Sequence, residues 1–104
     1  MGKAELLVDE ILTFNDNRFV ALVKVFKVAK GPKFPDGFKV RCVLLDTERD
    51  VPILLLDNHE PHGYHVHTKL PEDKDFRVSI IVKGYVEAVD LFLKEARKVV
   101  ADEK

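Results

Sequence analysis

The sequence predicts an α+β fold, in which an antiparallel β-sheet meander of five to six strands carries a C-terminal amphipathic helix packed on one face. Residues 5–82 contain short stretches rich in β-branched and aromatic residues, separated by clusters of Gly, Pro, Asn and Asp. Residues 85–100 instead repeat their apolar positions at intervals of three and four. Because the connections between the predicted strands are short, neighbouring strands should pair in an antiparallel meander.

The N-terminal part is expected to supply three strands. Glu5–Phe14 fits the spacing of a helix and that of a strand, and the turn-forming Asn15–Asn17 that follows favours a hairpin with Phe19–Val28. Lys30–Gly37 holds two Pro and two Gly and is predicted to be a loop. Phe38–Leu45 alternates its apolar side chains, which predicts the third strand.

Three more extended segments are expected before the helix. Val51–Leu56 is predicted as the fourth strand, Tyr64–Leu70 as the fifth and Phe76–Val82 as a short sixth. From Tyr85 to Val100, apolar residues fall on one helical face and charged residues on the other. One sheet and one helix form two layers, so we expect a single domain over residues 1–104.

Composition limits the classes of function. The chain is 46% apolar and 34% charged with a net charge of −1, which predicts a globular protein without an overall positive field for nucleic acid. The single Cys42 lies in a predicted strand and should be a buried thiol. No apolar run could span a bilayer and no signal peptide is visible, so we expect a cytoplasmic location and no membrane partner. Six cations of the central segment form either a local basic patch or a solvated sheet face: Lys24, Lys27, Lys30, Lys33, Lys39 and Arg41.

All four histidines of the chain lie within nine positions: His59, His62, His65 and His67. On a strand, His65 and His67 point to the same face, about 6–7 Å apart along the chain. Tyr64 and Val66 then point to the apolar core. We therefore expect the His65–His67 pair on the exposed face, or in a cleft on it, and exposed imidazoles are free to titrate near neutral pH.

Acid–base chemistry is the first interpretation of this pair. One imidazole can take the proton of an RNA 2′-hydroxyl while the other protonates the leaving oxygen, which suits a metal-independent ribonuclease without a cofactor. The catalytic residues would then be His65 and His67, with Lys69 holding a phosphate. Gly63 would admit the substrate backbone, and Tyr64 and Arg77 would position it. The residues expected to support the loop, by capping or by orienting a histidine, are Asp57, Asn58, His59 and His62.

Two other interpretations stay open. A divalent metal (Zn, Fe or Mn) could bind His62, His65, His67 and Glu72, with Asp57, His59 and Glu60 as further candidates. The spacing from His65 to Glu72 partly resembles the first cupin metal motif, but the flanking glycines and a later histidine are absent. Alternatively, the histidines are surface and loop residues of a non-catalytic binding module.

The chain from Phe38 onward resembles the TumE family of toxin–antitoxin proteins. The shared pattern is an apolar strand ending in Asp57-Asn58, a short loop, Gly63-Tyr64-His65-Val66-His67, and a helix carrying Ala88 and Phe92. Two features differ from the TumE pattern: the additional loop histidines His59 and His62, and the long segment between His67 and the helix. The resemblance implies the toxin of a two-component module, a cognate helix-turn-helix antitoxin as partner and, by analogy, an RNA target. The open edges of the predicted sheet would also allow a homodimer.

Overall fold

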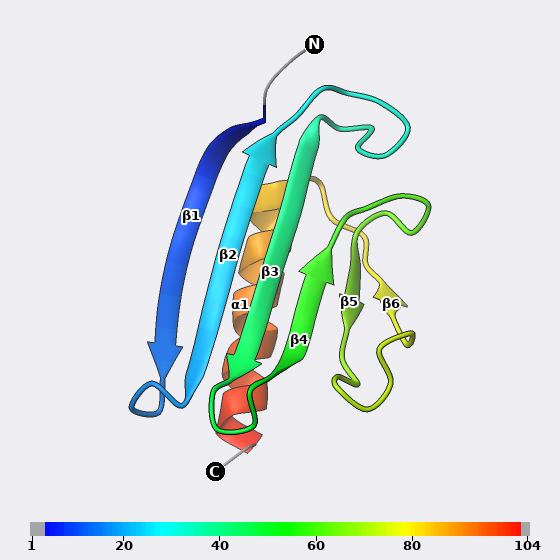
Figure 1. Ribbon diagram of the computed structural model, residues 1–104. Helices are drawn as coiled ribbons and strands as arrows, with labels where there is room; N and C mark the ends of the chain where they lie inside the picture. The colour runs from blue at the N-terminus through cyan, green and yellow to red at the C-terminus, as the bar shows by residue number, and fades with distance from the viewer. Residues whose placement is uncertain (1–3, 103–104) are drawn as a thin grey trace.

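The computed structural model describes residues 4–102 as a six-stranded antiparallel sheet with one helix behind it (Figure 1). The strands follow one another across the sheet in chain order. The elements are β1 (Glu5–Phe14), β2 (Phe19–Lys27), β3 (Phe38–Asp46), β4 (Val51–Asp57), β5 (His65–His67), β6 (Val78–Ser79) and α1 (Tyr85–Asp102). Since α1 contacts β2, β3 and β4, the predicted fold class is confirmed.

The β1–β2 hairpin decides the ambiguity of residues 5–14 in favour of a strand. Asn15, Asp16 and Asn17 have φ angles of 52°, 53° and 69°, in the left-handed region that Asn and Asp tolerate better than most residues. The Arg18 N–H donates to the Asn15 carbonyl at 3.1 Å and closes the turn. The turn residues were therefore a better guide to this hairpin than the apolar pattern of β1.

The core lies between α1 and the inner face of the sheet. Val23 and Val25 of β2 and Cys42 of β3 are buried there against Phe92 of α1. Burial and, to a smaller extent, the charge of Asp57 together raise the pKa of the Cys42 thiol to about 12. The prediction of a buried thiol is confirmed, and the thiol stays protonated at neutral pH. Within residues 4–102, no helix has the length and apolarity that a membrane crossing needs.

Asp46, at the end of β3, organises the β3–β4 turn. Its Oδ1 accepts hydrogen bonds from the N–H groups of Glu48 and Arg49 at 3.1 and 3.3 Å, and Arg18 donates to its Oδ2 at 3.3 Å. Burial alone would raise the pKa of Asp46, but these donors outweigh it and lower the pKa. The sequence predicted a polar turn here, but it did not predict that a buried carboxylate would accept the hydrogen bonds of the turn.

The fifth and sixth strands are shorter than predicted. Of Tyr64–Leu70 only β5 pairs with β4, and of Phe76–Val82 only β6 pairs with β5. The chain turns at Lys69, whose carbonyl accepts the Asp73 N–H at 2.7 Å, and this turn takes the following residues out of the ladder. The connection 68–77 therefore forms a long loop beside β5 and β6 (Figure 1).

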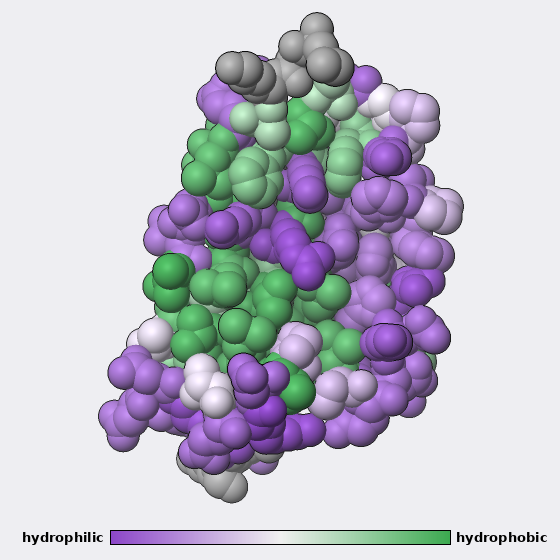
Figure 2. Space-filling view, viewed as in Figure 1, coloured by the Kyte–Doolittle hydropathy of each residue, from purple (hydrophilic) through white to green (hydrophobic). Residues whose placement is uncertain are grey.

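We call the sheet face opposite α1 the outer face. Figure 2 views it, and shows hydrophobic areas separated by a hydrophilic band. The strand register places its side chains in rows that run across the strands. One row contains Asp9, Lys24, Arg41, Asp57 and His65. The next row contains Ile11, Leu22, Val43, Leu55 and His67.

Candidate functional site

Three of the four histidines gather at β5. His65 and His67 point to the outer face, because Val66 between them lies in the core and pairs with Leu56. His62 joins them from the loop before β5. The ring centroids of His62 and His65 lie 5.6 Å apart and those of His65 and His67 5.0 Å apart, with interplanar angles of 76° and 71°. We call these three residues and Arg77 the histidine cluster.

Arg77 lies at the exposed end of the histidine cluster. Its NH1 donates to Nε2 of His62 at 2.9 Å, although the two residues are 15 positions apart in sequence. A guanidinium has no lone pair to offer, so this ring nitrogen of His62 is the acceptor and carries no proton. Arg77 therefore brings a fixed positive charge to the exposed ring of His62, an arrangement that suits an anionic substrate.

His65 is oriented by the backbone of Gly63. The His65 Nδ1 lies 2.7 Å from the Gly63 carbonyl oxygen, which can only accept, so Nδ1 carries the proton and donates. Gly63 has a φ of 61°, a conformation that glycine adopts without steric cost. Nε2 is then the ring nitrogen that is left to exchange a proton with a ligand. The geometry thus gives Gly63 an orienting role, while close approach of a substrate backbone stays a prediction.

His65 and His67 lie on the expected face of the sheet, but they are covered rather than exposed. Their exposed fractions are 3% and 8%, although both lie on the outer face. The loop 68–77 explains the burial, because it returns along β5, where the backbone of Lys74 hydrogen-bonds His67 and Arg77 reaches His62. Alternation along a strand determines which face a residue occupies, but not whether a later loop covers that face.

Burial also changes the titration of His67. Loss of water around the ring lowers its pKa, and the nearby charges of His65 and Arg77 lower it further; together these effects exceed the opposing influence of Lys74 and Asp57. His67 is therefore neutral at physiological pH rather than titrating freely, as the sequence led us to expect. Its Nδ1 is buried and has no partner among the described residues.

Three of the predicted site residues are engaged elsewhere. The Lys69 ammonium lies over the ring of Phe76, 4.3 Å from its centroid. The Tyr64 hydroxyl donates to Oδ2 of Asp36 at 2.8 Å, and burial, aided by Asp36, raises the pKa of Tyr64. His59 packs edge-on against Phe34, with ring centroids 5.4 Å apart. None of these contacts joins the histidine cluster.

Asp57 and Asn58 support the loop that leads to the cluster. Asp57 Oδ1 accepts the N–H of His59 at 3.0 Å, which is the expected cap. Asn58 is buried and reaches β3, where its Oδ1 accepts the Val40 N–H at 2.9 Å and its Nδ2 donates to the Phe38 carbonyl at 2.8 Å. The position of Asn58 directly after an apolar strand indicated a cap, whereas this tie to β3 depends on the tertiary structure.

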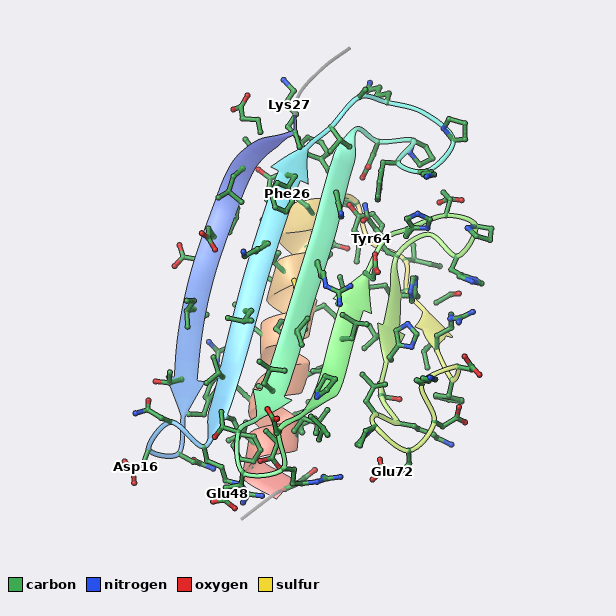
Figure 3. The ribbon with its side chains drawn as sticks, viewed as in Figure 1. Asp16, Phe26, Lys27, Glu48, Tyr64 and Glu72 are labelled. Carbon is green, nitrogen blue, oxygen red and sulfur yellow. The ribbon has the colours of Figure 1, made fainter. Side chains whose placement is uncertain are left out.

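The alternative set of metal ligands is not assembled. Across residues 4–102, no three His, Cys, Asp or Glu side chains are grouped in a way that could hold a metal ion. Glu72, the fourth member of that set, forms an ion pair with Arg49 at 3.2 Å. Figure 3 shows Glu72 on the loop at the far end of β5 from Tyr64.

Comparisons with protein-family models, curated proteins and solved structures find no match to this chain. The likeness to TumE proteins therefore depends on the motif residues alone.

Proposed function

We propose that this protein is an acid–base ribonuclease of the kind that serves as the toxin in a toxin–antitoxin module. The observation that carries the proposal is the continuous series of His62, His65 and His67 with Arg77 at its exposed end. Two adjacent imidazoles and a guanidinium are the groups that phosphodiester transfer needs: a base, an acid and a partner for the phosphate charge.

Because its lowered pKa keeps His67 neutral, so that it has no proton to give as an acid, we assign the reacting pair to His62 and His65. A phosphate would draw the guanidinium of Arg77 away from His62, because a guanidinium binds phosphate oxygens in a bidentate manner. His62 Nε2 is then free to take the proton of the 2′-hydroxyl. His67 stays behind His65 as a neutral positioning residue.

His65 would act as the acid in this scheme. Its Nδ1–H remains on the Gly63 carbonyl, so the proton that it transfers is carried on Nε2. Within residues 4–102, no group forms a hydrogen bond with His65 Nε2. This nitrogen is also not cut off from solvent, so a ligand can reach it. The bond from O2′ to phosphorus forms as the bond from phosphorus to O5′ breaks, and His65 protonates O5′. The products are a 2′,3′-cyclic phosphate and a 5′-hydroxyl.

Cleavage of an end-labelled RNA by purified variants tests this assignment. His62→Ala and His65→Ala should each lower the cleavage rate about 100-fold or more, since general acid–base groups typically contribute about 10²–10⁴. His59→Ala is the matched control, because His59 lies in the same loop but packs against Phe34. Equal rates for the parent, both cluster variants and the control would refute the proposal. Repeating the assay with a chelator tests the metal alternative directly.

A growth assay addresses the toxin role. Expression of the parent should inhibit growth, the His62→Ala/His65→Ala double variant should not, and His59→Ala should inhibit as the parent does. The expected partner is a helix-turn-helix antitoxin encoded beside this protein, and its co-expression should restore growth. Inhibition that is independent of both cluster histidines would contradict the ribonuclease mechanism.

A further inference from the structure

The row of outer-face residues that ends at His65 begins with Asp9 on β1 and continues with two cations, Lys24 on β2 and Arg41 on β3. The register pairs Lys24 with Arg41, Arg41 with Asp57 and Asp57 with His65. Two positions along the strands, Phe26 pairs with Lys39. We call Lys24, Phe26, Lys39 and Arg41 the basic block; Figure 3 labels Phe26 on β2. Three of the six central cations thus lie side by side, on the same face as the histidine cluster.

The cations of the basic block are available to a ligand. Lys24 and Lys39 are exposed, and neither makes an ion pair with any carboxylate of residues 4–102. Arg41 NH1 lies 3.8 Å from Asp57 Oδ2, and its side chain is 55% exposed. An exposed pair at that distance is weak, so the guanidinium can turn to a phosphate at little cost.

The strands that carry the basic block also offer apolar contact on the outer face. Phe26 is half-buried on the outer face, and the half-buried Leu22 and Val43 lie in the neighbouring row. Figure 2 shows the hydrophobic areas on both sides of the hydrophilic band. Bases of a single strand stack on aromatic rings while cations follow the backbone, and this surface combines the two kinds of contact.

The dimensions fit a short extended strand. From Lys24 to His65 the row crosses three strand spacings of about 4.8 Å, or about 14 Å in total. Since about 3.4 Å per nucleotide is the rise of a stacked strand in a duplex and an extended strand spaces its phosphates further apart, this length corresponds to fewer than about four nucleotides. A duplex would hide its bases from Phe26, whereas an unpaired strand can lay them on the sheet.

We propose that the outer face is a binding track for single-stranded RNA, which leads from the basic block to the histidine cluster. The track rests on the proposed function for the identity of the ligand and deepens it by naming unpaired RNA as the substrate. Phe26 stacks a base, Lys24, Lys39 and Arg41 hold successive phosphates, and the chain continues across β4 to Arg77 and His62.

A second copy of the protein is the competing occupant of this face. Ile11 is 67% exposed and lies in the same outer-face row as Leu22 and Val43. Pairing through the free edge of β1 is opposed by Asp9 and Glu10 at mid-strand and by the bulge between Leu6 and Val8. A homodimer that formed through the outer face would exclude RNA from it.

Fluorescence anisotropy with a labelled 2′-O-methyl RNA of about twelve nucleotides tests the track. This probe has no free 2′-hydroxyl and cannot be cleaved by the proposed mechanism, so binding is measured apart from catalysis. Lys24→Glu/Lys39→Glu should raise Kd at least about tenfold and reduce the slope of log K against log salt by about 1.4, since each phosphate contact contributes about 0.7. Phe26→Ala should raise Kd about tenfold.

The matched control is Lys94→Glu/Arg97→Glu, which makes the same change in charge at exposed positions of α1. It should change Kd by less than about twofold. An equal increase in Kd for both double variants would overturn the track, because RNA binding would then depend on the overall charge of the protein and not on the outer face. Absence of RNA binding by the parent would overturn the track as well. So would a dimer, detected by light scattering, that does not bind RNA and that Ile11→Glu dissociates. Binding that survives in a protein unable to cleave RNA would refute only the ribonuclease proposal.

Discussion

Replacement of Asn58 by Ala should lower the free energy of unfolding by about 3 kcal/mol. The side chain is 3% exposed and joins the start of the 58–64 loop to β3. Its Oδ1 accepts the Val40 N–H and its Nδ2 donates to the Phe38 carbonyl, at 2.9 and 2.8 Å. Val40 is fully buried, so no water can take the place of the lost oxygen.

The magnitude follows from the two groups that the substitution leaves unpaired. A buried donor or acceptor without a partner costs about 1–3 kcal/mol. The Val40 N–H lies at the upper end of this range, because it is sealed from solvent. The Phe38 carbonyl is part-buried and lies near the lower end. For a domain of this size, about 3 kcal/mol corresponds to a decrease in Tm of about 12–24 °C.

Urea denaturation followed by circular dichroism measures the effect. Asp57→Ala is the neighbouring control: it removes the cap on His59 and the exposed contact with Arg41, and should cost about 1 kcal/mol or less. Asn58→Asp keeps the acceptor for Val40 but buries a carboxylate against the Phe38 carbonyl oxygen, so at neutral pH it should be no more stable than Asn58→Ala. If Asn58→Ala is no less stable than Asp57→Ala, the tie to β3 does not contribute as argued.

Two further predictions concern titratable groups. The pKa of His67 is lower in the native state than in the unfolded state, so protonation of this ring favours unfolding. The contribution of neutral His67 to the free energy of unfolding is fully present above the unfolded pKa of about 6.5 and is lost as pH falls through the native pKa. His67→Gln should therefore flatten the dependence of Tm on pH below about 6.5, and an unchanged dependence would contradict the burial of this ring. Cys42, buried and with its pKa raised to about 12, should react with a thiol reagent only after unfolding; rapid labelling of the native protein would show that the core is open.

Several features of the fold and the site could be predicted because their causes are local. The left-handed turn at Asn15–Asn17 depends on the residues that form it, so it identified the β1–β2 hairpin. The apolar period of α1 and the alternation of β3 depend on neighbours a few positions away. The shared face of His65 and His67 follows from the same alternation, and the grouping of histidines was visible in the chain itself.

What the sequence left undecided depends on contacts between distant segments. The loop 68–77 leaves the sheet at Lys69 and returns along β5, which shortens β5 and buries both of its histidines. The same path brings Arg77 to His62, while His59 turns away to Phe34. Strand periodicity acts over two residues and fixes the direction of a side chain. Its exposure is a property of the whole surface, and here a later loop determines it.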